Sequence, residues 1–322
     1  MVAAQEVMAE LSLAIRQIGV KMNLYQCQIK PISPFATKLK GDTIFGQICW
    51  AIAYKYGKDE LENLLNNYEN RPFLIVSDGF APGFLPKPKA PSYILGEDML
   101  TKKQNRDKIW LDIASLQSAK FSHAKSNDEA NYKIVANATI KNSINYLSNT
   151  TGDGFSPYAL MEFNIPITQI YFLLDINQFS AKKLAQTLEF VSQMGYGKKS
   201  SIGKGRFEII QELSPVLEPF ITNSNSFMTL SPCVIEGDYD ECYYEPFTRF
   251  GKHGAQLAVK NPFKNPILMA DTAALITPKI SELNSIKSKG YIGKAVANIS
   301  STQPNAYSQG YAIIISVAKE IG

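Results

Sequence analysis

The chain has 322 residues, a net charge of +4, 45% hydrophobic residues and 19% charged residues, which is an ordinary globular composition. No apolar run approaches the roughly 20 residues of a membrane span, and the first residues lack a secretory pattern. The four cysteines have no C-x-x-C spacing and are too sparse for a disulfide scaffold. We therefore expect a reduced, cytoplasmic protein with no membrane contact, no cofactor and no structural metal, in which any basic surface is local.

The first residues predict a tail ahead of the folded body. Residues 1–21 have an amphipathic helical pattern, with Val7, Leu11 and Ile15 near one face. We interpret this segment as an N-terminal extension or tail, and we expect the body to begin at residue 22.

The next segments predict a strand, a helix and a second strand. Residues 24–32 and 73–76 have the composition of strands. An apolar stripe at helical spacing follows Gly41, and either Asp42 or Thr43 is the expected N-cap of that helix.

A long basic excursion comes next in the chain. Residues 79–110 contain four prolines and six cationic residues, and excursions of this length are typical of functional or disordered segments. We place an insertion at about 79–130 within the first domain.

The remaining segments of the first domain predict strands and one helix. Strands are expected over 132–146, 159–176 and 206–213, and Ser180 is the expected cap of the helix that lies before the last strand. The order strand, helix, strand, strand, helix, strand matches a ferredoxin-like unit, which we assign to residues 22–214.

Pro215 and Pro219 mark a boundary, after which helical signal is weak. Strand-like runs occur at 227–230, 267–270, 296–299 and 312–317. We expect a second, degenerate and mostly β ferredoxin-like domain over 215–322. The predicted fold class is α+β, with tandem ferredoxin-like (RRM-like) domains, a glycine-rich loop and a β-hairpin or thumb-like insertion.

Residues 195–206, the glycine loop, hold four glycines and four cationic residues. A Walker A loop is excluded because five residues separate Gly197 from Gly203, and a dinucleotide fingerprint is excluded because this loop closes a helix rather than opening one. The helix dipole would repel phosphate at that end, so cations and loop N–H groups would have to bind it. The alternative is a glycine-rich turn with a solvated basic tip.

Residues typical of catalysis are sparse. The two histidines, His123 and His253, show no metal-ligand spacing, and no nucleophile motif is present. His123 could act in acid–base cleavage of RNA or be a surface histidine, and His253 could be a ligand contact or a structural residue. Cys49 lies on the apolar stripe and is expected in the core. We predict no enzymatic activity.

Three anion-friendly segments remain, and together they favour a binder of single-stranded RNA or DNA. They are the residues before the first helix N-terminus, the glycine loop, and the basic segment 249–253. Nearby aromatic residues could stack on unpaired bases. The residues that we expect to contact RNA are Lys38, Lys40, Thr43, Phe45, Gly195, Tyr196, Gly197, Lys198, Lys199, Ser200, Ser201, Gly203, Lys204, Arg206, Arg249, Lys252, His253, Gln309 and Tyr311.

Several segments, taken in chain order, carry a family likeness. They are residues 32–47, 83–88, 141–146, 195–206, 262–264 and 309–312. This set resembles the RAMP superfamily of CRISPR proteins, and more narrowly the fourth Csm subunits of type III-A effector complexes. The likeness covers about Met22 to Val317. Tyr146 stands where those relatives usually carry arginine, and Ser308 lies near a position where they often carry histidine.

The resemblance implies an RNA-binding subunit that is not itself a nuclease. Its relatives cap the 5′ handle of the crRNA between two ferredoxin-like domains and contact the large Cas polymerase/cyclase subunit and a Cas7-like backbone subunit. Their β-hairpin thumb helps to interrupt the guide–target duplex, which implies target RNA near the handle as a further partner. Residues 79–110 are the candidate thumb or a neighbouring interaction surface. The alternatives are a Cas6-like repeat-processing endoribonuclease and a protein-interaction scaffold with an incidental basic loop.

Overall fold

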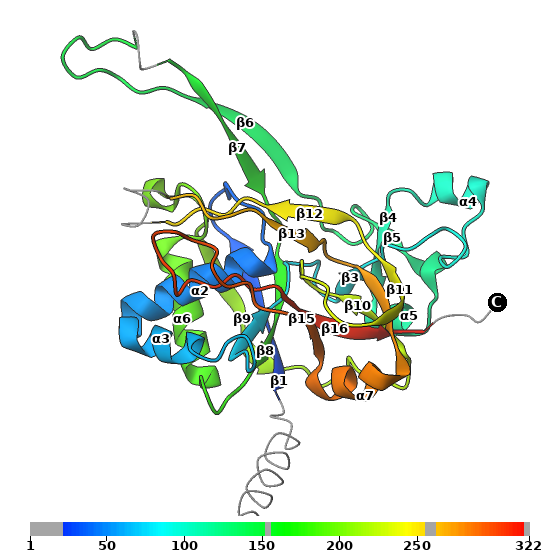
Figure 1. The fold of residues 1–322 in the computed structure, drawn as a ribbon. Helices are drawn as coiled ribbons and strands as arrows, with labels where there is room; N and C mark the ends of the chain where they lie inside the picture. Colours follow the sequence, from blue (N-terminus) through cyan, green and yellow to red (C-terminus); the bar gives the residue numbers. More distant parts are fainter. Residues whose placement is uncertain (1–21, 152–155, 255–261, 319–322) are drawn as a thin grey trace, which may run out of the picture.

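The computed structural model describes residues 22–151, 156–254 and 262–318 (Figure 1). The expected tail at 1–21 lies outside this part of the chain.

The N-terminal half is built on a four-stranded antiparallel sheet in the order β2-β8-β1-β9. Its strands are β1 (Asn23–Pro31), β2 (Leu74–Val76), β8 (Thr168–Leu174) and β9 (Phe207–Pro215). The accompanying helices are α2 (Gly41–Tyr56), α3 (Lys58–Leu65) and α6 (Ala181–Met194). Along the chain, these elements follow the predicted order of strand (β1), helix (α2), strand (β2), strand (β8), helix (α6) and strand (β9).

The apolar stripes of α2 and α6 meet one face of β1. Ile29 of β1, Ile48 of α2 and Val191 of α6 are buried and border one small cavity of about 20 Å³. Because buried side chains recur at three- to four-residue spacing along both helices, burial of this face stabilises the helical conformation. The core prediction made from periodicity is therefore confirmed, except that Cys49 is only partly buried against this core.

The two helices begin differently. The Ser180 side chain accepts a hydrogen bond from the Lys183 N–H at 3.2 Å, so the predicted cap of α6 is confirmed. The predicted cap of α2 is wrong, because Lys40 occupies the N-cap position and its side chain makes no cap bond. The Asp78 carboxylate, which follows β2, accepts the Gly41 N–H at 2.7 Å instead.

The insertion folds into a small lobe and not into a projecting hairpin. Its three-stranded sheet has the order β3-β4-β5. The elements of this lobe are β3 (Phe84–Pro86), α4 (Met99–Gln104), β4 (Lys108–Asp112), α5 (Ile113–Gln117), the 3₁₀ turn η1 (Phe121–His123) and β5 (Lys125–Ser126). Residues 79–110, the candidate thumb or neighbouring interaction surface, form no projecting hairpin, since they pack into a lobe that buries Trp110.

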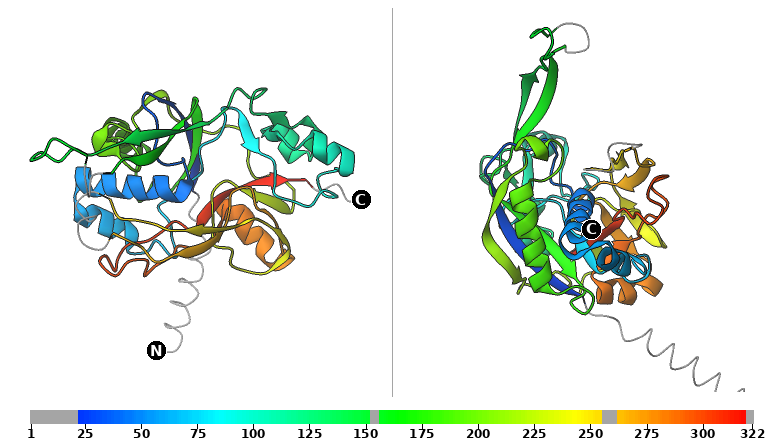
Figure 2. Two further views of the ribbon diagram at one scale, coloured as in Figure 1. Left: turned by 90° about the horizontal axis from the view of Figure 1, so that it is seen from above. Right: turned by 90° about the vertical axis from the view of Figure 1, so that its left-hand side faces the viewer.

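The hairpin that projects from the body is formed by β6 (Val135–Lys141) and β7 (Tyr158–Asn164) (Figures 1 and 2). Strands were predicted in both regions, but 159–176 divides into β7 and β8 around Pro166. Opposite residues of an antiparallel pair share a face, and one face here carries only apolar side chains. That face consists of the pairs Ala136 with Phe163, Ala138 with Met161, and Ile140 with Ala159.

The C-terminal half has a five-stranded antiparallel sheet in the order β11-β14-β10-β16-β15. Its strands are β10 (Ser226–Thr229), β11 (Tyr239–Tyr243), β14 (Leu275–Pro278), β15 (Tyr291–Gly293) and β16 (Tyr311–Val317), and β12 (Pro246–Arg249) pairs separately with β13 (Ile267–Ala270). The strand predicted at 296–299 is wrong, and the helix α7 (Ile280–Lys289) was not predicted.

The two halves share one hydrophobic core. A single buried cluster contains Phe172 of β8 together with Met228 of β10 and Ile313 of β16. The side chain of Gln309 spans the halves as well, because its Nε2 donates to the Val76 carbonyl and its Oε1 accepts the Val76 N–H, both at 2.8 Å. Gln309 therefore extends the hydrogen bonding of the first sheet at the β2 edge.

Candidate nucleic-acid interface

The glycine loop closes α6 and returns to β9 through a tightly folded turn. At Gly205 the φ angle is 74°, and a Cβ there would lie 2.1 Å from the Tyr196 carbonyl oxygen. At Gly197 φ is 77°, and a Cβ would lie 2.6 Å from the Thr37 hydroxyl. These two glycines are needed because the loop packs closely on itself and on the segment before α2.

Most of the loop N–H groups that we expected to bind phosphate are already engaged. The Lys198 N–H donates to the Thr37 hydroxyl at 3.0 Å, and the Gly205 N–H donates to the Pro34 carbonyl at 3.0 Å. Other loop donors with partners in the protein are the N–H groups of Gly195, Tyr196, Gly197, Ile202, Gly203, Lys204 and Arg206. Binding at this loop must therefore depend mainly on side chains.

Tyr196 is a core residue and is not available to stack on a base. Its ring is buried against Phe35, with ring centroids 5.8 Å apart. Its hydroxyl donates to the Lys38 carbonyl at 2.9 Å, and burial raises the pKa of this phenol far above its ordinary value. The expectation that Tyr196 contacts RNA through its ring is wrong, because its role is to hold the loop against the segment that precedes α2.

The cations of the loop divide into two kinds. Lys204 Nζ lies 2.8 Å from Glu162 Oε1 of β7, and this contact lowers the pKa of the Glu162 carboxyl. Lys204 thus joins the loop to the base of the hairpin and is not a free cation. Lys198, Lys199 and Arg206 are exposed and have no acidic partner within the described residues.

Two exposed lysines lie beside aromatic rings of the hairpin. Lys199 Nζ is 5.5 Å from the centroid of the Tyr158 ring, and Lys38 Nζ is 5.8 Å from that of Phe163. Both distances allow a cation–π contact. We call the exposed cations Lys38, Lys198, Lys199 and Arg206, with the rings of Tyr158 and Phe163, the basic–aromatic band.

Sequence reasoning did not single out Tyr158 or Phe163. The available signal was the pairing of β6 with β7, which places Tyr158 opposite Lys141 and turns Phe163 to the apolar face. That signal depends on strand register, which cannot be fixed from the residues alone.

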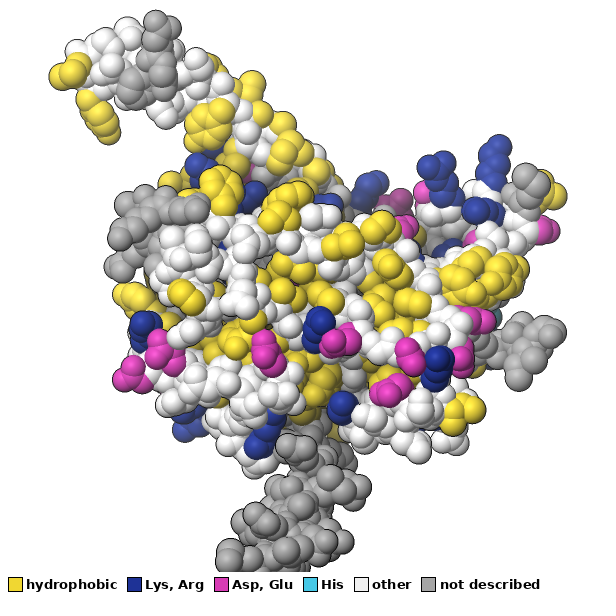
Figure 3. Space-filling model, viewed as in Figure 1, with side chains coloured by type: hydrophobic (Ala, Val, Ile, Leu, Met, Phe, Trp, Pro, Cys, Tyr) yellow, Lys and Arg dark blue, Asp and Glu magenta, His cyan; other side chains and the backbone are white. Residues whose placement is uncertain are grey.

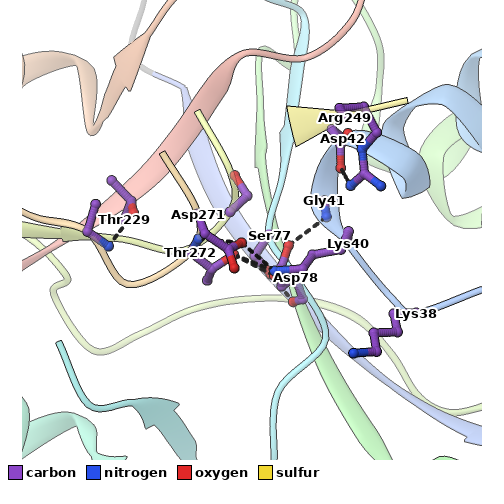
Figure 4. Close-up of polar contacts among 12 residues, drawn as sticks. Lys38, Lys40, Gly41, Asp42, Ser77, Asp78, Thr229, Arg249, Asp271 and Thr272 are labelled. Atoms are coloured by element: carbon purple, nitrogen blue, oxygen red, sulfur yellow. Dashed lines mark hydrogen bonds and ion pairs between the residues drawn. The ribbon is translucent and has the colours of Figure 1, made fainter. Parts of the chain in front are cut away.

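The N-terminus of α2, which we expected to attract phosphate, already holds carboxylates of the protein. Figure 4 shows Lys40 and Thr272 converging on one oxygen of Asp78, whose other oxygen accepts the Gly41 N–H, while Asp271 lies beside Lys40. Lys40 Nζ lies 3.0 Å from Asp78 Oδ2 and 2.6 Å from Asp271 Oδ1. The predicted anion site is therefore wrong, because Asp78 occupies it and Lys40 neutralises Asp78.

Arg249 is likewise used within the protein. Its Nη2 donates to Asp42 Oδ1 at 2.6 Å while its Nε donates to Asp42 Oδ2, so the guanidinium forms a two-pronged ion pair at the start of α2. The guanidinium carbon also lies 4.7 Å from the centroid of the Phe247 ring. The predicted RNA contact by Arg249 is contradicted, because its directional donors are bound to a carboxylate.

Other predicted contacts are buried. Phe45, Gln309 and Tyr311 are at most 3% exposed, so none of these side chains can reach an RNA. The Tyr311 hydroxyl donates to the Tyr68 carbonyl at 3.2 Å and packs the second half against the first. Thr43, Ser200 and Gly203 are half-buried, and Ser201 is exposed at the loop tip.

The two histidines lie in separate parts of the fold. His253 Nε2 is 2.7 Å from the Ser300 hydroxyl. Burial, and to a smaller extent the positive charge of Lys264, lowers the pKa of His253. His123, in η1 of the lobe, has Nδ1 3.3 Å from the Ser115 hydroxyl. Lys252, beside His253, is exposed, with its Nζ 4.4 Å from the centroid of the Phe263 ring.

Neither a metal site nor a membrane span is found among the described residues. Within residues 22–151, 156–254 and 262–318, His, Cys, Asp and Glu side chains form no group of three or more that could hold a metal ion. Over the same ranges, every helix is too short or too polar to cross a membrane. Cys27, Cys49, Cys233 and Cys242 are free thiols, and burial raises the pKa of the Cys49 thiol to about 12.

Comparison with known families places this loop and hairpin in context. The family model described as the RAMP superfamily matches residues 38–208, which is more than half of the chain and includes the glycine loop and the β6–β7 hairpin. The chain belongs to the RAMP superfamily. The resemblance inferred from ordered sequence segments is thereby confirmed. No curated protein sequence matches this RAMP chain.

Solved structures refine the fold of this RAMP protein. It resembles a chain in a Csm1–Csm4 cassette in complex with pppApA, with a TM-score of 0.59, 16% identity, and coverage of 94% of this chain and 100% of that one. It also resembles a chain in a Csm3–Csm4 subcomplex of the type III-A CRISPR-Cas interference complex, with a TM-score of 0.56, 16% identity, and coverage of 92% and 100%. Csm4 is the subunit common to both complexes, so the fold is that of a Csm4-like RAMP.

Proposed function

We propose that this chain is an RNA-binding structural subunit of a type III-A (Csm) CRISPR effector complex. In this role it caps the 5′ handle of the crRNA, and it joins the large Cas polymerase/cyclase subunit to the Cas7-like backbone filament. The chain itself is non-catalytic in this proposal. In this proposal the chain consists of two ferredoxin-like units, and the second unit lacks its first helix. The strand orders β2-β8-β1-β9 and β11-β14-β10-β16 support this description, because in each the second, third, first and fourth strands of the unit lie side by side in that order.

The observation that carries the proposal is the basic–aromatic band. Exposed cations without acidic partners are suited to phosphates, and the exposed ring of Tyr158 and the half-buried ring of Phe163 beside them are suited to unpaired bases. Lys38 lies in the segment before α2, whereas Lys199 and Arg206 lie in the glycine loop, and contacts between the two segments and with the hairpin base bring these cations together. Tyr158 and Phe163 lie on opposite faces of the hairpin, each with a lysine beside its ring, so a single-stranded RNA would meet a cation next to a ring on either face of the hairpin.

The proposed partners follow from the solved complexes that share the fold. Those complexes pair Csm4 with Csm1 and with Csm3, which supports a large subunit and a backbone subunit as neighbours of this chain. The projecting hairpin adds a surface for target RNA near the handle. Figure 3 shows hydrophobic side chains along this hairpin. Ile140 on its apolar face is 76% exposed, and Tyr146 and Leu147 beyond β6 are 95% and 97% exposed. We propose that this hairpin, and not residues 79–110, is the thumb.

Removing the band's cations tests the proposal. The change is Lys198→Ala, Lys199→Ala and Arg206→Ala together, since all three side chains are exposed and their loss leaves no carboxylate unpaired. Each lost phosphate contact lowers the slope of log affinity against log salt by about 0.7, so the slope for handle RNA should fall by about 2.

A matched control separates specific contacts from net charge. Lys120, Lys182 and Lys289 are exposed and have no acidic partner in the described residues, so replacing all three with alanine removes the same charge elsewhere. The control should keep the slope of the unmodified protein. Equal slopes for the test and control variants would contradict a handle-binding role for the band.

The alternative is a Cas6-like endoribonuclease, favoured by the superfamily loop and by the polar contact of His123 with Ser115. The purified protein is incubated with labelled CRISPR repeat RNA in EDTA. We expect intact RNA. Cleavage that His123→Ala or His253→Ala abolishes would replace the structural role with the catalytic one.

A further inference from the structure

A groove of about 750 Å³ lies between the lobe and the second half of the protein. One wall runs from Pro86 through α4 to Ile109, and the other is formed by residues 242–245, at the end of β11 and directly after it. Its volume lies within the range of about 300–1,000 Å³ that is usual for ligand sites. None of the residues in the basic–aromatic band lines this groove.

Contacts between the two walls fix the shape of the groove. The Lys89 N–H donates to the Ala273 carbonyl at 2.8 Å, and the hydroxyls of Tyr93 and Tyr243 are 2.9 Å apart. Lys89 Nζ also lies 3.1 Å from Glu245 Oε1. Because the lobe is bonded to the second half at three points, the groove is largely preformed.

The groove carries an uncompensated positive charge. The two acidic residues in its lining are each paired, Glu97 with Lys87 at 2.9 Å and Glu245 with Lys89. Lys102 and Arg106 are exposed and have no acidic partner in the described parts of the chain. Figure 3 shows Lys and Arg side chains gathered over the α4 region at the upper right of the molecule.

An exposed aromatic surface accompanies this charge. Tyr244, in the wall opposite α4, is 49% exposed. Cations alone would suit any anion, including an acidic peptide. A tyrosine facing the same space adds a surface for a planar base, and base–aromatic stacking with phosphate contacts is the usual recognition of single strands.

We propose that this groove is a second RNA-binding site, which holds a short single-stranded segment with its phosphates on Lys102 and Arg106 and a base against Tyr244. The site lies on elements that the handle-capping role does not use, so it stands or falls separately from that role. The segment could belong to the guide RNA or to a target RNA, which share the chemistry that the groove recognises.

The test uses the full chain and a fluorescent oligouridylate RNA. The background is the variant in which Lys198, Lys199 and Arg206 are alanine, so that binding at the band is already weakened. Adding Lys102→Ala and Arg106→Ala should lower the slope of log affinity against log salt by a further amount of about 1.4, since two phosphate contacts are lost. Tyr244→Ser should weaken binding at least about fivefold, the lower end of a lost stacking contact.

The control adds Lys182→Ala and Lys289→Ala to the same background and should change neither slope nor affinity. An unchanged slope after loss of Lys102 and Arg106 would overturn the proposal, whatever the band does. Binding of a polyglutamate peptide that depends on Lys102 and Arg106, without RNA binding that depends on them, would assign the groove to an acidic protein and would also overturn it. In the assembled complex, crosslinks from 4-thiouridine placed in the guide or in the target distinguish the two RNA sources.

Discussion

Asp78 is the residue whose loss should most damage the joint between the two halves. Its side chain is 8% exposed and serves three partners: the Gly41 N–H, Lys40 Nζ and the Thr272 hydroxyl. Asp78→Ala removes the acceptor for the Gly41 N–H, a helix cap worth about 1 kcal/mol. It also removes an acceptor from Lys40 Nζ and from the Thr272 hydroxyl, at a cost of about 1–1.5 kcal/mol each. The expected loss in the free energy of unfolding is therefore about 3–4 kcal/mol, consistent with breaking a buried ion pair.

Two further variants resolve the contributions. Asp78→Asn keeps an oxygen for the Gly41 N–H but removes the charge that faces Lys40, so it should cost about 1–2 kcal/mol. Asp238→Ala breaks an exposed ion pair with Lys279, in which the Asp238 side chain is 74% exposed, and should cost less than about 1 kcal/mol.

Urea denaturation followed by circular dichroism measures all three variants. The expected order of stability loss is Asp78→Ala, then Asp78→Asn, then Asp238→Ala, with unchanged dependence on urea concentration. If Asp78→Ala were no more costly than Asp238→Ala, the carboxylate would be neither a cap nor a joint, and the reasoning would be refuted.

Three further predictions concern the loop, the ion cluster and the hairpin. Gly205→Ala should lower the free energy of unfolding by about 3 kcal/mol or more, because the new Cβ would overlap the Tyr196 carbonyl. Gly203→Ala should lower it by about 1 kcal/mol, because open space surrounds this residue and only its φ of 85° opposes a side chain. Equal losses in urea denaturation would contradict the packing described for the loop. Burial opposes the charge of Lys40, but the carboxylates of Asp78 and Asp271 outweigh burial and raise its pKa above the ordinary 10.5. The stabilisation from this raised pKa is present below pH 10.5 and is lost as the pH rises through the folded-state value, so Lys40→Met should lessen the alkaline loss of stability, and identical alkaline profiles would refute this. Glu162→Gln should speed hydrogen exchange of the β7 amides, because it loosens the contact with Lys204. Glu212→Gln, at an exposed side chain of β9, should leave these rates unchanged. Equal exchange rates in the two variants would show that Lys204 does not hold the hairpin.

The framework of the first half could be predicted because it follows from local patterns. Apolar spacing located α2 and α6, a serine marked the start of α6, and alternating or buried runs located β1, β2 and β9. The ordered family segments then identified the superfamily. Each of these signals lies within a short stretch of chain.

The fate of individual cations could not be predicted, because their partners are distant in sequence. Lys40 meets Asp271 across 231 positions, and Arg249 meets Asp42 across 207. In the sequence both cations resemble free anion ligands. Only tertiary packing shows that each already has a carboxylate, and the same holds for Lys204 with Glu162.

Exposure of aromatic residues was equally inaccessible. Tyr196 and Tyr311 lie near glycines and cations in the sequence, yet both are buried in the structure. Tyr158 and Phe163 lie beside lysines only because a hairpin register brings them there. Residue type predicted a nucleic-acid surface, whereas the fold decides which side chains form it.

The central claim is that the basic–aromatic band holds the crRNA 5′ handle. The most direct measurement is mass-spectrometric mapping of RNA–protein crosslinks in a type III-A complex reconstituted with this chain, using a photoreactive base in the handle. The account predicts crosslinked peptides from residues 195–206 and from β7. Handle crosslinks that leave both segments unmarked, while marking other subunits, would contradict it.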